Sequence, residues 1–249
     1  MKVSKILVSQ PRPAVIEKSP FFEFSEKNNL NVDYKPLIKV VGVSLKEFRA
    51  QRTEILDHTT MIFSSRTTID SFFRICEEAR ITVPETMKYI CNTEAVALYL
   101  QKYIVYRKRK ISFADGTFNS LVELIVKHKD EKFLIAATAD NVQGDLHKMF
   151  SKTKYKFESA AFVKIIYSDL KEIELDKYQI AVFYSPSDVK SLQENFPEFE
   201  QKELQIATFG PAVAKAVNAA GFTANITAPT PEAPSIAKAL MLHLQKETK

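Results

Sequence analysis

The segments Gln179–Val189, QIAVFYSPSDV, and Gln205–Gly221, QIATFGPAVAKAVNAAG, establish the architecture of this chain. Each opens with an apolar run, Ile180–Tyr184 or Ile206–Phe209, that is short enough for a buried strand. A polar or glycine turn and then a helical pattern follow each run. Strand, tight turn and helix form the unit of a parallel α/β sheet, with the turn at the carboxyl end of the strand. Unpaired N–H groups and the helix dipole favour a negatively charged ligand at such a turn.

The same unit occurs earlier in the chain. Three pairs of segments repeat in the same order, at offsets of 120, 119 and 115 residues: Met61–Ser65 with Val182–Ser185, Tyr89–Ala97 with Thr208–Ala216, and Asn119–Leu121 with Pro234–Ile236. Three repeats in one order predict a duplicated domain. We therefore expect two similar α/β halves with a ligand between them.

Composition limits the class of protein. The chain has 249 residues, which suggests one or two domains, and 45% hydrophobic residues with 18 Phe are enough for a sizeable core. No apolar run approaches the ~20 residues of a membrane span, and the N-terminus lacks the apolar region of a signal peptide. Two cysteines give no disulfide framework, and free thiols fit the cytoplasm. The four histidines lack metal-ligand spacing, so we expect no metal site.

The charge of the chain is modestly basic. A formal net charge of +5 suits an anionic small molecule as the ligand. The densest basic run is Tyr106–Lys110, YRKRK, within a predicted strand over 104–113. We interpret the run as a solvated strand edge or turn, with a patch that faces carboxylates as the alternative. Because the run is isolated and no nucleic-acid-binding motif accompanies it, we expect no nucleic-acid partner.

The order of the predicted elements indicates that one domain is discontinuous. The first predicted strand, Lys5–Ser9, and its helix need a sheet, and we expect them to join the second half of the chain. An extended stretch at 32–43 leads away from them, and a charged return stretch follows the strand at 160–167. The resulting prediction is a domain of residues 1–38 and 170–249 that encloses a domain of residues 41–167, with hinge strands at 35–43 and 165–171.

Six segments also carry a family resemblance that runs nearly from end to end. They are PLIKVVGVSLKEFRAQR (36–52), IFSSRTTIDSFFRIC (62–76), MKYICNTEAVALYLQKYIVYRKRK (87–110), FYSPSDVKSLQENFPEF (183–199), IATFGPAVAKAVNAAGF (206–222) and APTPEAPSIAKAL (228–240). In their order and spacing they resemble uroporphyrinogen-III synthase, in the form seen in Bacteroidetes-type sequences. The resemblance implies an α/β fold of two similar parallel-sheet lobes (flavodoxin-like or HUP-like) joined by two crossing strands.

The resemblance also implies a reaction. The family takes the linear tetrapyrrole hydroxymethylbilane, removes its hydroxyl as water and closes the ring with the last pyrrole inverted, through a spirocyclic intermediate. No cofactor or metal is used, and the expected protein is a cytoplasmic monomer of haem biosynthesis. The substrate has eight carboxylates, which suits a site of strand ends and helix N-termini. Catalysis there consists mostly of folding a flexible substrate into a reactive shape.

One residue stands out as the catalytic candidate. The family's Tyr at the end of the strand before the return crossing corresponds to Tyr167. The resemblance implies that this phenol assists departure of the hydroxyl, because a phenol is protonated at neutral pH and donates to a leaving oxygen. On the residues alone, Tyr167 also fits an amphipathic side chain at a strand end.

The candidate substrate-binding residues all lie in turns. The resemblance assigns them to the family's binding turns, and in each turn helix capping or turn chemistry is the alternative role. They are Ser65, Thr93, Thr138, Asn141, Ser185, Ser187, Gly210, Pro211 and Thr230.

The chain departs from the family pattern at three positions. Val213 stands where Thr is common, and in the first copy Cys91 replaces Gly and Glu94 replaces Thr, so that neighbouring Thr93 is the substitute candidate. These departures keep open a non-catalytic bilobal module that binds a tetrapyrrole or another polyanion. A periplasmic-type solute receptor is a third alternative, but it requires an export signal. We expect Cys91 to be a small buried hydrophobe and not a nucleophile.

Overall fold

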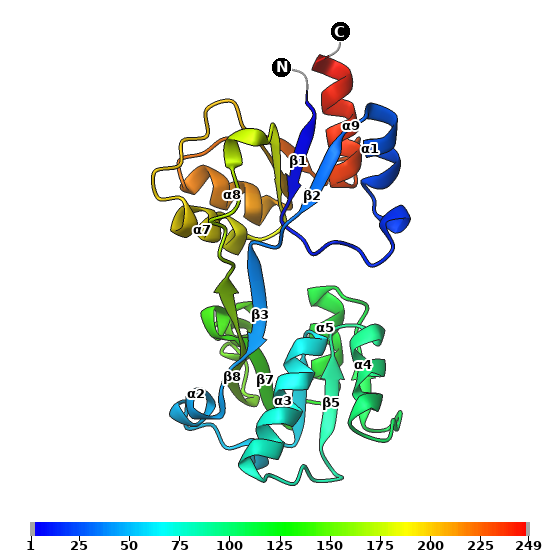
Figure 1. Ribbon diagram of the computed structural model, residues 1–249. Helices are drawn as coiled ribbons and strands as arrows, with labels where there is room; N and C mark the ends of the chain where they lie inside the picture. Colours follow the sequence, from blue (N-terminus) through cyan, green and yellow to red (C-terminus); the bar gives the residue numbers. More distant parts are fainter. Residues whose placement is uncertain (1–2, 248–249) are drawn as a thin grey trace. The chain divides into compact units, whose positions relative to one another are not determined.

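The computed structural model describes residues 3–247. The chain forms two compact units, Met1–Lys39 with Ile166–Lys249 (the discontinuous unit) and Val40–Ile165 (the inserted unit) (Figure 1). The junctions therefore lie at 39/40 and 165/166, whereas the sequence prediction placed them at 38/41 and 167/170. The second junction falls inside a continuous strand that runs on to Tyr167.

The inserted unit contains a six-stranded sheet in the order β3-β8-β7-β4-β5-β6, in which the strands from β8 to β6 are parallel. Its strands are β3 (Ile38–Gly42), β4 (Thr60–Phe63), β5 (Lys88–Cys91), β6 (Ile111–Phe113), β7 (Lys132–Thr138) and β8 (Lys156–Tyr167). Its helices are α2 (Leu45–Ala50), α3 (Arg66–Ala79), α4 (Glu94–Tyr99), α5 (Phe118–Val126) and α6 (Asp145–Phe150).

Helices cover both faces of this sheet. Alternate residues of each strand point to opposite faces. Met61 and Phe63 of β4 pack with α3 residues such as Phe72, whereas Ile62 packs with α5 and α6 residues such as Ile125. A parallel sheet with both faces buried has strands of near-continuous apolar sequence, as observed in β4 and β7.

The discontinuous unit contains a five-stranded parallel sheet in the order β11-β10-β9-β1-β2. Its strands are β1 (Lys5–Val8), β2 (Asn31–Tyr34), β9 (Ile180–Phe183), β10 (Gln205–Phe209) and β11 (Ala224–Ala228). Its helices are α1 (Phe22–Asn28), α7 (Pro186–Asn195), α8 (Pro211–Ala219) and α9 (Ile236–Glu247). Helices α1 and α9 pack on one face and α7 and α8 on the other.

The two sheets share one strand order. Read from the edge, β11-β10-β9-β1-β2 corresponds to β6-β5-β4-β7-β8. The N-terminal strands β1 and β2 thus take the positions that β7 and β8 hold in the inserted unit. This correspondence explains why residues from both ends of the chain build one sheet.

Two strands have different bounds in the structure from those that the sequence predicts. The strand predicted over 104–113 is only Ile111–Phe113, because the amides of Lys110 and Ile111 both donate to Arg107 O and close a turn. The basic run therefore forms a turn, in which Arg107 pairs with exposed Glu85. The stretch 32–43 is interrupted at Pro36, which has no N–H to donate to a ladder, and it forms β2 in one sheet and β3 in the other.

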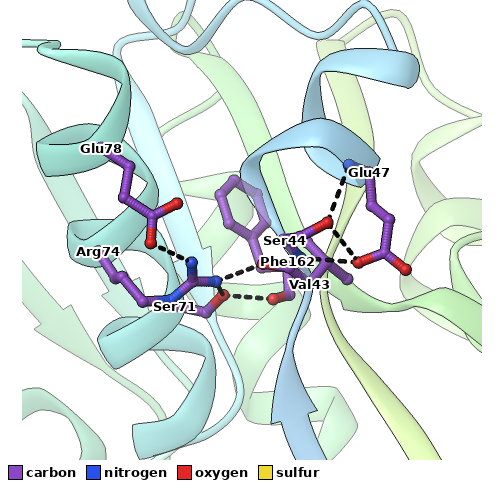
Figure 2. Close-up of polar contacts among 7 residues, drawn as sticks. All are labelled: Val43, Ser44, Glu47, Ser71, Arg74, Glu78 and Phe162. Carbon is purple, nitrogen blue, oxygen red and sulfur yellow. Dashed lines mark hydrogen bonds and ion pairs between the residues drawn. The ribbon is translucent and has the colours of Figure 1, made fainter.

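The stretches that pass between the units are residues 37–43 and 162–168, hereafter the crossing segments. In the inserted unit, Phe162 O accepts the N–H of Val43 (3.0 Å) and the hydroxyl of Ser71 on α3. Arg74, one turn along α3, donates to Val43 O and pairs with Glu78 at 2.7 Å (Figure 2). Helix α3 therefore holds both crossing segments at the point where they enter this unit.

The discontinuous unit repeats this arrangement. Leu37 O accepts the N–H of Ser168 (2.9 Å) and the hydroxyl of Ser191 on α7 (2.6 Å). Ser191 follows Ser71 by 120 residues, the same offset that relates the two strand–turn–helix units. The two accepting carbonyls, at 37 and 162, are 125 residues apart, as are the two donating amides, at 43 and 168. We call each pair of bonds to one carbonyl a serine clamp.

The serine clamp of the inserted unit leads to a stability prediction. Ser71→Ala removes the buried hydroxyl but leaves Phe162 O bonded to Val43 N–H, so the loss should be about 1 kcal/mol of unfolding free energy. Urea denaturation followed by circular dichroism measures it. Ser151→Ala, at an exposed helix end, is the matched control and should change stability by less than half as much. Equal effects of the two changes would contradict a clamp at Ser71.

Candidate functional site

The carboxyl edge of the inserted sheet carries two predicted site residues as helix caps. Ser65 accepts the N–H of Thr68 at the start of α3 (3.3 Å), and Thr93 accepts the N–H of Val96 at the start of α4 (3.3 Å). Both side chains thus take the capping role that was their alternative. Their oxygens satisfy helix amides, and the Ser65 hydroxyl also donates to Thr68 Oγ1 (3.4 Å).

A cavity of about 160 Å³ opens at the same edge. Two predicted residues line it: Thr138, the last residue of β7, and Asn141 just beyond that strand. Ser65 and Thr93 do not line it, but the residues just before them do. The polar side chains of the wall are Ser64, Asn92, Thr138, Asn141, Asp145 and His147.

Ser64 and Asn92 are not among the predicted residues, for a local reason. Each is the last residue before a helix cap, and the family resemblance assigns the binding role to the cap itself. Asn92 donates its N–H to Phe63 O (3.0 Å), which fixes it beside the end of β4. A polar residue between a buried strand and its N-cap is the signal that would have identified both.

Gly144 shapes the far wall of this cavity. A Cβ at this position would lie 2.7 Å from Asn141 Oδ1 and 2.8 Å from Nδ2, closer than nonbonded atoms approach. Only glycine therefore leaves the Asn141 amide where it is, with its donor group available at the cavity.

The carboxyl edge of the discontinuous sheet is organised by Asp188, which is almost fully buried. Its Oδ2 accepts the hydroxyl of Ser9 (2.8 Å) and the N–H groups of Tyr184 and Ser185 (both 2.9 Å). These bonds tie the end of β1 to the end of β9. Ser185 caps α7 by accepting the N–H of Ser187 (3.2 Å), which is itself buried.

Burial raises the pKa of the Asp188 carboxyl above its ordinary value of 3.8. Its three hydrogen bonds act in the opposite direction, but the net direction is upward because the loss of hydration dominates. Oδ1 has no partner among the described residues. The carboxyl is thus a structural group of the turn and is not presented to a ligand.

The next turn along this edge leads into α8. Gly210 adopts φ +97°, a left-handed conformation that favours glycine, and donates its N–H to Ala228 O (2.6 Å). No side chain caps α8, whose first residue is Pro211. Thr230, two residues beyond Ala228, accepts the N–H of Ala233 (3.0 Å) and closes the following turn. Gly210, Pro211 and Thr230 therefore lie on adjacent strand ends.

Tyr167 is the last residue of β8 and belongs to the discontinuous unit. The residue is 37% exposed, and its phenol makes no hydrogen bond to any residue in the described chain. The phenol is therefore available to an external acceptor. The position of the phenol is therefore determined by the backbone of Tyr167.

The three departures from the family pattern have distinct surroundings. Val213 points into the core between α7 and α8, so it makes no turn contact. Glu94 is exposed at the start of α4. Cys91 is fully buried, and burial raises the pKa of its thiol to about 12, which keeps it protonated and unreactive.

Two general features complete the description of the site. Within residues 3–247, no three His, Cys, Asp or Glu side chains come together in a way that would hold a metal ion. In the same range, no helix is long and apolar enough to cross a membrane.

The raised pKa of Asp188 predicts a pH-dependent stability difference. Between pH 3.8 and the raised pKa, the folded chain holds a proton that the unfolded chain has released, so the stability of the wild type falls as pH rises through this interval. Asp188→Asn has no carboxyl to titrate at this position, so its unfolding free energy should rise relative to that of the wild type over the same interval. Urea unfolding from pH ~4 to ~7 measures both, with exposed Asp176→Asn as the control. A constant difference between wild type and Asp188→Asn would contradict the assignment.

Comparison with known proteins places the chain. A family model described as uroporphyrinogen-III synthase HemD matches residues 24–238. The fold resembles uroporphyrinogen-III synthetase from Helicobacter pylori, at 16% identity and a TM-score of 0.61 over 98% of this chain and 99% of that one. A mutant uroporphyrinogen III synthase from the extremely thermophilic bacterium Thermus thermophilus matches at 14% identity and a TM-score of 0.56, over 98% of both chains.

These low identities show a shared fold, and no curated protein sequence matches the chain. The family model, in contrast, is a match of sequence and spans most of the 249 residues. Its range includes the ends of all strands that carry the candidate site residues. On this match, the chain belongs to the uroporphyrinogen-III synthase HemD family.

Proposed function

We propose that this chain cyclises hydroxymethylbilane to uroporphyrinogen III in haem biosynthesis, with loss of water and inversion of the last pyrrole ring. The observation that carries the proposal is the family match over residues 24–238 of a chain with the family's fold. In the classification of reactions it acts as a cyclising hydro-lyase.

The carboxyl edges of the two sheets offer suitable groups for a substrate with eight carboxylates. No side chain caps the N-terminus of α8, and the positive end of its helix dipole attracts an anion. In the inserted unit, the cavity lined by Thr138 and Asn141 is large enough for an acetate or propionate side chain. Ser65, Thr93, Ser185 and Ser187 contribute hydroxyls beside these turns, and the net charge of +5 favours the encounter.

Tyr167 assists the loss of the hydroxyl group. Its free phenol donates to the oxygen of the hydroxymethyl group while the adjacent electron-rich pyrrole pushes that oxygen out as water. The carbon that loses the oxygen bonds to the substituted α-carbon of the last pyrrole and gives a spirocyclic intermediate. The bond from that α-carbon to its original methylene bridge then breaks, the freed bridge carbon bonds to the other α-carbon of the same pyrrole, and that carbon gives up its proton. The protein contributes position and one hydrogen-bond donor, and no covalent intermediate with a side chain is needed.

A second candidate is a non-catalytic module that binds a tetrapyrrole or another polyanion. Inward-pointing Val213 and the exposed negative charge of Glu94 favour it, because neither supports a contact to a carboxylate. Incubation with hydroxymethylbilane separates the candidates. Spontaneous closure gives uroporphyrinogen I, so type III isomer after oxidation and chromatography identifies the enzyme, whereas binding with only type I identifies the module.

The remaining features of the proposal concern the state of the protein. We place it in the cytoplasm, where buried Cys76 and Cys91 stay reduced. It acts as a monomer on a small molecule, without a nucleic-acid partner or a cofactor. The segments 35–43 and 165–171 act as hinge strands, since the chain passes from one unit to the other within them.

Tyr167→Phe tests the proposed donor. The change keeps the ring but removes the hydroxyl, so kcat for type III formation should fall about 10- to 1,000-fold. The melting temperature should stay within about 1 °C, because the hydroxyl has no partner among the described residues. A wild-type rate in the Phe variant would refute the role of Tyr167.

Asn141→Ala tests the cavity in the inserted unit. Loss of one donor to a carboxylate should raise KM about 5- to 30-fold with little change in kcat, the pattern of a pure binding contact. Gln143→Ala, an exposed neighbour that does not line the cavity, is the matched control. If both variants kept the wild-type KM, no substrate carboxylate would occupy this cavity.

A further inference from the structure

The backbone that follows Tyr167 is held from two directions. Ser168 donates its N–H to Leu37 O (2.9 Å), and its own carbonyl accepts a hydrogen bond from Asn195 Nδ2 (3.0 Å). Asn195 Oδ1 in turn accepts the N–H of Leu170 (3.0 Å). One side chain thus bridges the first and third residues after Tyr167.

Helix α7 provides a rigid base for these bonds. Asn195 is the last residue of α7, and its Nδ2 also donates to Ser191 O (2.9 Å) in the turn before it. Ser191 is fully buried and completes the serine clamp on Leu37 O. Leu170 is buried as well, so the loop that Asn195 holds is packed against the unit and not free in solvent.

This arrangement matters because nothing else in the described structure orients the phenol. The Tyr167 side chain has no hydrogen bond among the described residues, and the residue is partly exposed. Its direction follows from the backbone dihedral angles on either side. The bond from Ser168 N–H to Leu37 O fixes the peptide plane between Tyr167 and Ser168, and the bond from Asn195 to Ser168 O fixes the next plane. A donor displaced by about 1 Å from a reacting group can lose about 100-fold in rate.

The duplication shows which contacts belong to the fold in general. Ser71 and Ser191 lie 120 residues apart and make the same bond, so the serine clamp is common to both units. At the same offset, Asn195 corresponds to Ile75, which is fully buried in an apolar core. The asparagine is therefore not needed to close this helix onto a crossing segment. It occurs in the unit that carries Tyr167.

We propose that Asn195 is a positioning residue for Tyr167. By bonding Ser168 O and Leu170 N–H, it fixes the backbone after the strand end and so directs the phenol toward the leaving hydroxyl. This inference rests on the proposed function, in which the Tyr167 phenol is the donor.

Asn195→Ala tests the inference in wild-type and Tyr167→Phe backgrounds. In the wild type, kcat for type III formation should fall about 10- to 100-fold, with KM within about threefold, because the misplaced group acts on the reacting atoms. In the Tyr167→Phe background, the same change should cost less than about threefold, since no donor remains to be misplaced. Asn218→Ala, near the end of α8, is the matched control, because its amide also accepts a backbone N–H beyond the helix, that of Ala224 at the start of β11.

Two further measurements keep the outcome decisive. Asn195→Asp preserves the acceptor for Leu170 N–H but removes the donor to Ser168 O, so it should show an intermediate loss of kcat even if the Ala variant folds poorly. In labelled Asn195→Ala, the order parameter of the Leu170 amide, which loses its acceptor, should drop from about 0.85 toward 0.6. This relaxation measurement does not depend on activity.

The possible failures are distinguishable. Equal losses of kcat in both backgrounds would make Asn195 a purely structural residue, and an Ala variant as active as Asn218→Ala would also overturn the inference. An unchanged order parameter at Leu170 would do the same. By contrast, a wild-type chain that forms only type I isomer would refute the proposed function, while the order parameter would still report whether Asn195 fixes this backbone.

Discussion

Hydrogen bonds to two backbone carbonyls, Leu37 O and Phe162 O, hold the crossing segments in place. Each accepts one N–H from the other crossing segment and one serine hydroxyl from a helix of its own unit. A buried carbonyl with both lone pairs engaged is hard to displace, because a lost partner leaves a desolvated acceptor. The chain thereby leaves and enters each unit at a fixed point.

The candidate catalytic residue lies next to one of these fixed points. Tyr167 precedes Ser168, whose amide is bound in the clamp of the discontinuous unit. Two other candidate residues are also held by hydrogen bonds: Gly210 donates its N–H to Ala228 O, and Ser185 donates its N–H to the Asp188 carboxylate. These two turns are thus held in place by hydrogen bonds, which is how the groups of a site are preorganised.

Much of this arrangement could be predicted from the sequence because it depends on local pattern. The 120-residue offset identified equivalent strand–turn–helix units, and it also relates Ser71 to Ser191, although nothing in the local pattern singles out these serines. The carboxyl end of β8 at Tyr167 follows from a strand that stops at a charged stretch. Asn195 could not be predicted, because its partners lie 25 and 27 residues away and its role appears only once α7 is packed. The cavity beside Ser64 and Asn92 likewise depends on how three strand ends meet.

Hydrogen exchange at the amides of Val43 and Ser168 tests the serine clamps most directly. Both amides lie at the ends of crossing segments, where a flexible linker would exchange at the rate of an exposed loop. If each is bound to a clamped carbonyl, both should exchange as slowly as the amides of the central strands β4 and β9. Rapid exchange at either amide would show that the chain is not fixed where it enters that unit.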